Sequence, residues 1–323
     1  MKKFGKLIVK LRIPILILSV LLLIPAAIGY FNTKVNYDIL YYLPGDIDTM
    51  KGQDILLDDF GKGAYAMVVV DGMNKKNVSE LVKKVEKVDH VASVISYNGI
   101  VGDGVPAEIL PDKFRSYFEN DDSGATLFAI FFDDTTSSTE TMDAIEELRD
   151  VTDKQCYIAG MSAVVTDTKS MSEKETPIYV LVAVLLVCVV LAIFMDSFLV
   201  PVLFMVSIGM AIVYNLGTNI FLGEVSYITK ALAAVLQLGV TLDYSIFLWH
   251  SYKEEKEKNP DDHKEAMAVA IGNTLTSVVG SSITTVAGFI ALCFMSFTLG
   301  LDLGIVMAKG VIFGVIGCVT ILP

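Results

Sequence analysis

The sequence predicts an α-helical membrane protein with six transmembrane helices, one before and five after an inserted α+β domain outside the cytoplasm. The chain of 323 residues is 53% hydrophobic and only 19% charged, whereas about a quarter of the residues of a soluble domain carry charge. Its mean hydropathy is +0.58, and long uncharged runs flank one polar segment. The formal net charge of -12 argues against nucleic acid as a partner.

Residues 13–31 form the first predicted transmembrane helix. They carry no charge, and as a helix they would extend about 28 Å, roughly the thickness of a bilayer core. A signal peptide is the alternative, but its apolar core is usually only about 7 to 15 residues long. Five basic residues precede the run and identify residues 1–31 as a cytoplasmic N-terminus and first helix. They are Lys2, Lys3, Lys6, Lys10 and Arg12.

Residues 32–176 form the inserted domain. They contain 14 basic and 27 acidic residues, so the acidic excess of the whole chain belongs to this segment. Their strand-like and helical patterns follow the order strand, helix, strand, repeated once, which is the order of a ferredoxin-like fold. The strand-like runs lie at 65–70, 90–97, 126–132 and 156–159, and the helical patterns lie at 78–88 and 139–151.

Residues 177–323 form the predicted five-helix bundle. Uncharged or nearly uncharged runs lie at 177–195, 197–223, 225–249, 266–301 and 303–323. Residues 266–273 suit a helix at the membrane interface that leads into a span at 274–297. Between the third and fourth of these runs, residues 251–265 form a polar loop with four lysines and six acidic residues. Alternation from a cytoplasmic N-terminus puts this loop inside and residues 32–176 outside.

Asp243 is the main candidate for function, because an ionisable residue at membrane depth costs at least about 2.5 kcal/mol. It lies roughly 10 Å from the inner end of its helix, which Trp249 and His250 mark, and its short stem cannot reach the surface. Hydrocarbon disfavours the charged form of a carboxyl, so Asp243 is suited to bind and release a proton, with the hydroxyl of Tyr244 beside it. The alternative is a permanently protonated carboxyl that only joins helices.

Two further residues are possible relay partners of Asp243. Ser281 lies about level with it by helix rise and belongs to a stripe of small and hydroxyl residues, which also suits close helix packing. Lys309 lies about 10 Å nearer the outer side, so an ion pair with Asp243 and extension to the interface are both open. Asn215 and Asn219 are expected at the membrane interface, since they lie near the outer end of their helix.

No pattern typical of an enzyme or a cofactor site is present in the sequence. There is no GxxxxGK[ST] loop for phosphate, and the three histidines are too scattered for a metal site. The four cysteines have neither disulfide nor zinc spacing. An intramembrane aspartyl protease needs a second carboxyl at the depth of Asp243, whereas Asp196 and Asp302 lie at helix ends. We therefore expect no enzymatic activity, no cofactor and no metal.

The segment GVTLDYSIFLWHSYKEE at 239–255 resembles the fourth-helix motif of the MMPL branch of the RND transporter superfamily, through its Asp-Tyr pair and its charged exit. Residues 266–292, with their paired hydroxyl residues, resemble the following helix of that family. The sequence YLPGD at 42–46 resembles the family's segment after the first helix. Together with the one-plus-five layout, the resemblance covers essentially the whole chain.

The resemblance implies a transporter that uses the proton gradient to export lipids or other hydrophobic molecules across the plasma membrane, with Asp243 and Tyr244 in the proton relay. It implies that residues 32–176 are a porter domain. The implied partners are membrane lipids, the hydrophobic substrate and a second repeat, because the family usually has two repeats. We expect the chain to be the N-terminal half of a longer protein, or else a half-size protein that pairs with another copy. The alternatives are a protein-export accessory similar to SecD and SecF and a lipid-sensing membrane protein.

Overall fold

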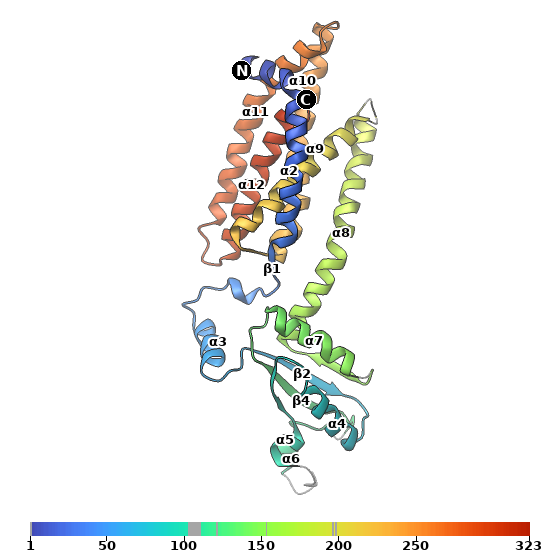
Figure 1. Ribbon diagram of the computed structural model, residues 1–323, viewed down its shortest axis with the longest axis vertical. Coiled ribbons are helices and arrows are strands. Elements are labelled where there is room, and N and C mark those ends of the chain that lie inside the picture. Colours follow the sequence, from blue (N-terminus) through green and yellow to red (C-terminus); the bar gives the residue numbers. More distant parts are fainter. Residues whose placement is uncertain (1, 103–110, 121, 153, 196, 198) are drawn as a thin grey trace. The chain divides into compact units, whose positions relative to one another are not determined.

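The computed structural model describes residues 2–323 except 103–110, 121, 153, 196 and 198 (Figure 1). The chain forms two compact units. One contains Met1–Asn36 and Ser172–Pro323, and the other contains Tyr37–Met171. The first unit is mostly helical, whereas the second combines helices with a four-stranded sheet.

Six helices of the described residues are long and apolar enough to cross a membrane, which confirms the six predicted spans. They are α2 (Arg12–Asn32), α8 (Met161–Phe194), α9 (Leu199–Gly217), α10 (Tyr227–Lys258), α11 (His263–Leu292) and α12 (Leu299–Thr320). A short helix, α1 (Lys2–Lys10), precedes α2, and a 3-10 helix, η3 (Thr218–Leu222), follows α9.

Several helix boundaries differ from those expected from the sequence. Helix α8 begins well before the uncharged run at 177–195 and contains Pro177. Most of the expected polar loop at 251–265 is helical, since only residues 259–262 separate α10 from α11. Lysine and glutamate are good helix formers, and Glu255 pairs with Lys258 one turn later at 2.8 Å, so the charged end of α10 stays helical outside the apolar run. Helix α11 is continuous through the expected interfacial segment.

Helix α12 packs against α9, α10 and α11, and among the six described membrane-spanning candidates it is the most buried. Its glycines allow this close packing: a Cβ on Gly310 would lie 2.6 Å from the amide nitrogen of Asn215 on α9, and a Cβ on Gly314 would meet the side chain of Thr241 on α10. A two-stranded parallel sheet lies at one end of the bundle. It joins β1 (Lys34–Asn36), which follows α2, to β6 (Glu224–Ser226), which precedes α10.

The second unit contains an antiparallel sheet with the strand order β3-β4-β2-β5. Its elements include β2 (Ala64–Val70), α4 (Lys75–Val85), β3 (Val91–Ile95), β4 (Thr126–Phe132), α7 (Thr139–Val151) and β5 (Cys156–Ala159). They lie where the sequence patterns predicted them, within three residues at each end. Shorter helices are η1 (Leu40–Tyr42), α3 (Asp48–Asp58), α5 (Tyr97–Val101) and α6 (Asp112–Arg115).

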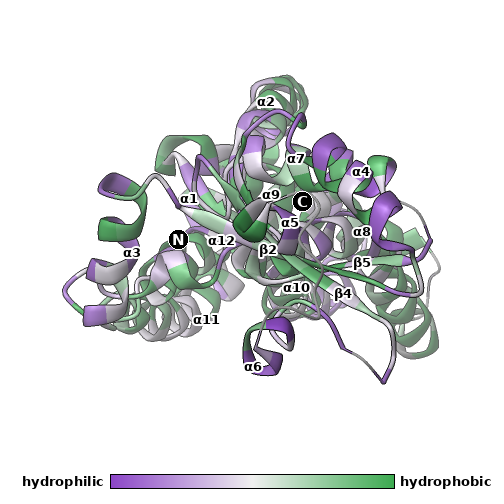
Figure 2. Ribbon diagram, turned by 90° about the horizontal axis from the view of Figure 1, so that it is seen from below, coloured by the Kyte–Doolittle hydropathy of each residue, from purple (hydrophilic) through white to green (hydrophobic). Residues whose placement is uncertain are grey.

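Alternating burial along the strands builds the core of this unit. In β2 and β4 every second side chain is buried, including Val68 and Ile130. Helices α4 and α7 cover that face with apolar residues such as Val82 and Ile145. Figure 2 shows α4 changing between hydrophilic and hydrophobic along its length, as expected for a helix with one face on a sheet.

The crossing of α2 and α9 generates a first prediction. A Cβ on Gly217 would meet the carbonyl oxygen of Ala26, so Gly217→Ala should destabilise the bundle by about 1–3 kcal/mol through overpacking. We expect a lower apparent Tm in detergent. Gly209→Ala on the same helix is the matched control, because no residue in the described part of the chain lies within 4 Å of a Cβ there. An equal effect of the two substitutions would contradict the close crossing.

Candidate functional site

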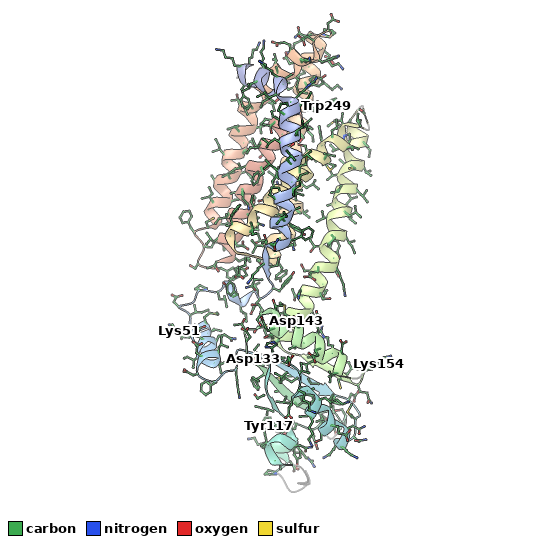
Figure 3. All side chains as sticks on the ribbon, in the orientation of Figure 1. Lys51, Tyr117, Asp133, Asp143, Lys154 and Trp249 are labelled. Carbon is green, nitrogen blue, oxygen red and sulfur yellow. The ribbon has the colours of Figure 1, made fainter. Side chains whose placement is uncertain are left out.

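Asp243 lies near the middle of α10 on its exposed face. The same face carries a stripe of exposed residues at intervals of three or four positions: Leu232, Leu236, Gly239, Asp243 and Phe247. Within the described part of the chain, its carboxylate has no hydrogen-bond or ion-pair partner. Trp249, labelled in Figure 3, follows on the same helix and packs against Tyr252, with 5.7 Å between ring centroids. An ionisable side chain therefore lies on an otherwise mostly apolar helix surface.

Tyr244 has the opposite orientation. Only 3% of its surface is exposed, and it packs in a cluster with Leu248, Ile271 and Val278 from α10 and α11. Its hydroxyl has no hydrogen-bond partner among the described residues. The structure therefore does not bring the side chains of Asp243 and Tyr244 into contact, because neighbouring helix positions point about 100° apart.

Ser281 lies on the exposed face of α11, the helix that packs beside α10. Its carbonyl oxygen accepts hydrogen bonds from the hydroxyls of Thr284 at 2.7 Å and Thr285 at 3.1 Å. The neighbouring Ser282 is buried instead and donates to the carbonyl of Val278 at 2.6 Å. Asp243 and Ser281 thus lie on the surfaces of adjacent helices, where both side chains are accessible.

Lys309 lies with Asn219 and not with Asp243. Its Nζ donates to Oδ1 of Asn219 on η3 at 2.6 Å. Asn219 is 1% exposed, so its side chain is buried among neighbouring elements. The ammonium of a lysine needs an acceptor inside an apolar bundle, and the Asn219 amide supplies one.

A buried amide pair, which the sequence patterns did not reveal, lies between α9 and α10. Nδ2 of Asn215 donates to Oε1 of Gln237 at 2.9 Å, and both side chains are almost fully buried. The expected depth of Asn215 and Asn219 at the membrane interface stays a prediction, whereas the burial of both side chains is observed. The two residues are far apart in the sequence, so their pairing carries no local signal. The absence of a side chain at Gly310 on α12 leaves room for the pair.

Asp302 joins the start of α10 to α12. Its Oδ2 accepts hydrogen bonds from the backbone N–H of Ser226 at 2.7 Å and from the hydroxyl of Thr229 at 2.8 Å. A carboxylate at a helix N-terminus also interacts favourably with the helix dipole. Among the described residues, no group of three or more His, Cys, Asp and Glu side chains is arranged to hold a metal ion.

The amide pair generates the second prediction. Asn215→Leu and Gln237→Met should each destabilise the bundle by about 1–3 kcal/mol, because each leaves a buried amide without its partner. The double variant should lose less than the sum, with a coupling energy of about 0.6–2 kcal/mol. Unfolding in mixed detergents measures all three variants. Additive effects would show that the hydrogen bond contributes nothing to stability.

A family model described as the MMPL family matches residues 43–323. A putative membrane protein of Methanocaldococcus jannaschii is 24% identical over 96% of this chain and 89% of its own length. The apo-petrobactin exporter of Bacillus anthracis is 22% identical over 96% of this chain, which spans only 42% of that exporter. The crystal structure of SecDF in its super-membrane-facing form aligns with 97% of this chain and 37% of that chain, at 14% identity and a TM-score of 0.49.

Proposed function

Because the chain belongs to the MMPL family, we propose that it is part of a proton-coupled transporter, which exports lipids or other hydrophobic molecules across the plasma membrane. The described residues include six long apolar helices, which make it a multi-pass membrane protein. The relative from Bacillus anthracis is named an exporter, which supports transport rather than an enzymatic reaction. In this proposal the proton gradient supplies the energy and no cofactor takes part.

The observation that carries the proposal is the exposed, unpartnered carboxyl of Asp243 at the middle of a membrane-spanning helix. A charged carboxyl facing lipid costs at least about 2.5 kcal/mol, and a polar partner that covers it removes this cost. We propose that the partner is a second repeat or a paired copy of the chain. No described residue lies within 4 Å of a Cβ built on Gly239, one turn earlier, so another helix has room to approach this face.

Asp243 is the proposed proton carrier. A neutral carboxyl donates a hydrogen bond, whereas a carboxylate only accepts, so each proton transfer changes the bonds that Asp243 makes with a covering helix. Two hydroxyls serve as the other proposed relay groups: that of Tyr244, which lacks a partner among the described residues, and that of Ser281, which is exposed on the adjacent helix. Lys309 contacts Asn219 and not Asp243, which favours a relay without this lysine.

Residues 37–171 form the proposed porter domain. The sheet order β3-β4-β2-β5 and the two strand-helix-strand segments support a ferredoxin-like fold for it. We place this domain outside the cytoplasm, because the basic residues before α2 favour a cytoplasmic N-terminus.

An apolar groove supports a hydrophobic substrate or a membrane lipid as the ligand class. The groove has a volume of about 420 Å³ and lies between α11 and α12. Its walls include Ile283 and Ile290 from α11 and Ile312 and Ile316 from α12. Both helices are membrane-spanning by length and composition, so the groove lies where an acyl chain or another apolar molecule can reach it from the bilayer.

The third prediction tests the relay. Asp243→Asn in the protein reconstituted in its native assembly should reduce proton flux to the level of empty vesicles, because an amide cannot carry the proton. A pH-sensitive dye inside the proteoliposomes measures the flux. Glu254→Gln is the matched control, since this exposed carboxyl lies near the end of α10. Unchanged flux in Asp243→Asn would eliminate Asp243 as the carrier.

The fourth prediction tests whether another helix covers this face. Gly239→Leu adds a side chain to the exposed face of α10, where no described residue lies within 4 Å of a Cβ at this position. The leucine would nevertheless occupy space that a close partner needs. We therefore expect reduced proton flux with an unchanged Tm. Gly209→Leu, at a similarly open position on α9, should leave both unchanged, and normal flux in Gly239→Leu would contradict a covering helix.

A further inference from the structure

Helix α1 has three distinct faces. At about 100° per residue, Gly5 and Ile8 share one face and are buried against the bundle. Phe4 and Leu7 share a second face with Leu11, which directly follows α1, and all three remain exposed. The lysines share the third face at the helical spacing of three or four residues; they are Lys2, Lys3, Lys6 and Lys10.

The buried face attaches α1 to the first turns of α11. A Cβ on Gly5 would meet the carbonyl oxygen of Ala268, so the two backbones are in close contact. Lys6 pairs with Glu265 on α11 at 3.0 Å. Ile8 belongs to the same apolar cluster as Tyr244. These contacts hold α1 against the end of the bundle at which α10 and α11 are joined.

The apolar stripe of Phe4, Leu7 and Leu11 is only partly covered by protein, with exposed fractions of 38%, 50% and 39%. The membrane-spanning helix α2 begins at Arg12, directly after this stripe. Helix α1 therefore ends next to the start of the first membrane-spanning helix, and its apolar stripe leads into the exposed apolar surface of α2. A helix with adjacent apolar and basic faces at this position is typical of one that lies in the membrane interface.

Most of the basic charge on α1 is not neutralised by protein. Among the described residues, Lys6 has a carboxylate partner, whereas Lys2, Lys3, Lys10 and Arg12 have none. The segment 2–12 contains no acidic residue. We propose that the exposed faces of α1 form a docking site for anionic lipid headgroups, with the apolar stripe inserted below them. The binding keeps Ile8 packed against the cluster that contains Tyr244.

The test uses the full chain in nanodiscs of phosphatidylcholine, with or without phosphatidylglycerol. Hydrogen exchange of the α1 amides should slow in the anionic nanodiscs, because lipid binding disfavours opening of the helix. Each lysine near an anionic surface contributes about fivefold in affinity. The double variant Lys3→Gln with Lys10→Gln should therefore lower the protection of the α1 amides from hydrogen exchange by about tenfold or more, to roughly the value in neutral lipid. Both side chains are exposed, so the substitutions leave the fold intact.

Lys76→Gln with Lys84→Gln on α4 is the control, since it removes the same charge from exposed positions in the other unit. In this control variant, phosphatidylglycerol should slow the hydrogen exchange of the α1 amides as much as it does in the unchanged chain. Equal protection of α1 in the two lipids would overturn the proposal, because the contacts with α11 alone would then hold the helix. Protection by free phosphate in neutral nanodiscs would also overturn it, since the site would then bind a soluble anion.

Discussion

A polar group inside a bilayer has no water to bond with, and the arrangement of this bundle follows from that constraint. The amides of Asn215 and Gln237 satisfy each other in part, and Lys309 is held by an amide oxygen. Asp302 accepts from the start of α10. Each of these contacts joins two segments that are distant in the sequence, so together they set how α9, α10, α12 and the connecting 3-10 helix are placed. Apolar packing alone is weakly directional among lipid tails, whereas hydrogen bonds between helices specify position.

Asp243 departs from this pattern. The polar side chains that link the helices find partners within the described chain, but this carboxyl projects from an exposed stripe of α10. The polar interior of the bundle and the face with Asp243 are therefore different features. The interior contacts hold the helices together, whereas the exposed carboxyl makes the face of α10 suited to contact with a further helix. Gly239, which has no close neighbour within the described chain, fits the same role.

The number and approximate position of the membrane helices could be predicted, because an uncharged run of about 20 residues is typical of a membrane span. The strands of the second unit followed from the alternation of apolar and polar residues. The direction of Asp243 could not be predicted. Within the membrane, apolar residues lie on all sides of α10, and its polar residues point in different directions: Gln237 and Thr241 are buried, whereas Asp243 is exposed. Polarity alone therefore does not fix the rotation of the helix about its axis. The pairing of Asn215 with Gln237 could not be predicted for the same reason, since it also depends on the rotation of α10.

Helix α1 shows a different limit. Its lysines were explained by the predicted cytoplasmic position of the N-terminus. The sequence therefore offered no further reason to expect a separate helix packed on the bundle. The contact that attaches this helix joins Gly5 to Ala268, which is distant in the sequence. A glycine in a short basic segment carries no signal of such a partner until the fold brings the two backbones together.

If a further helix covers Asp243 as proposed, its association with α10 depends on acidity. Any helix that covers this carboxyl contacts its neutral and charged forms differently, so its affinity differs between the two forms. Thermodynamic reciprocity then requires that a change in proton concentration alters the strength of the association, and that association alters proton binding by the same factor. This coupling between proton binding and association needs no conformational change within the single chain. The contact between the two halves of an assembly would itself respond to the proton gradient across the membrane.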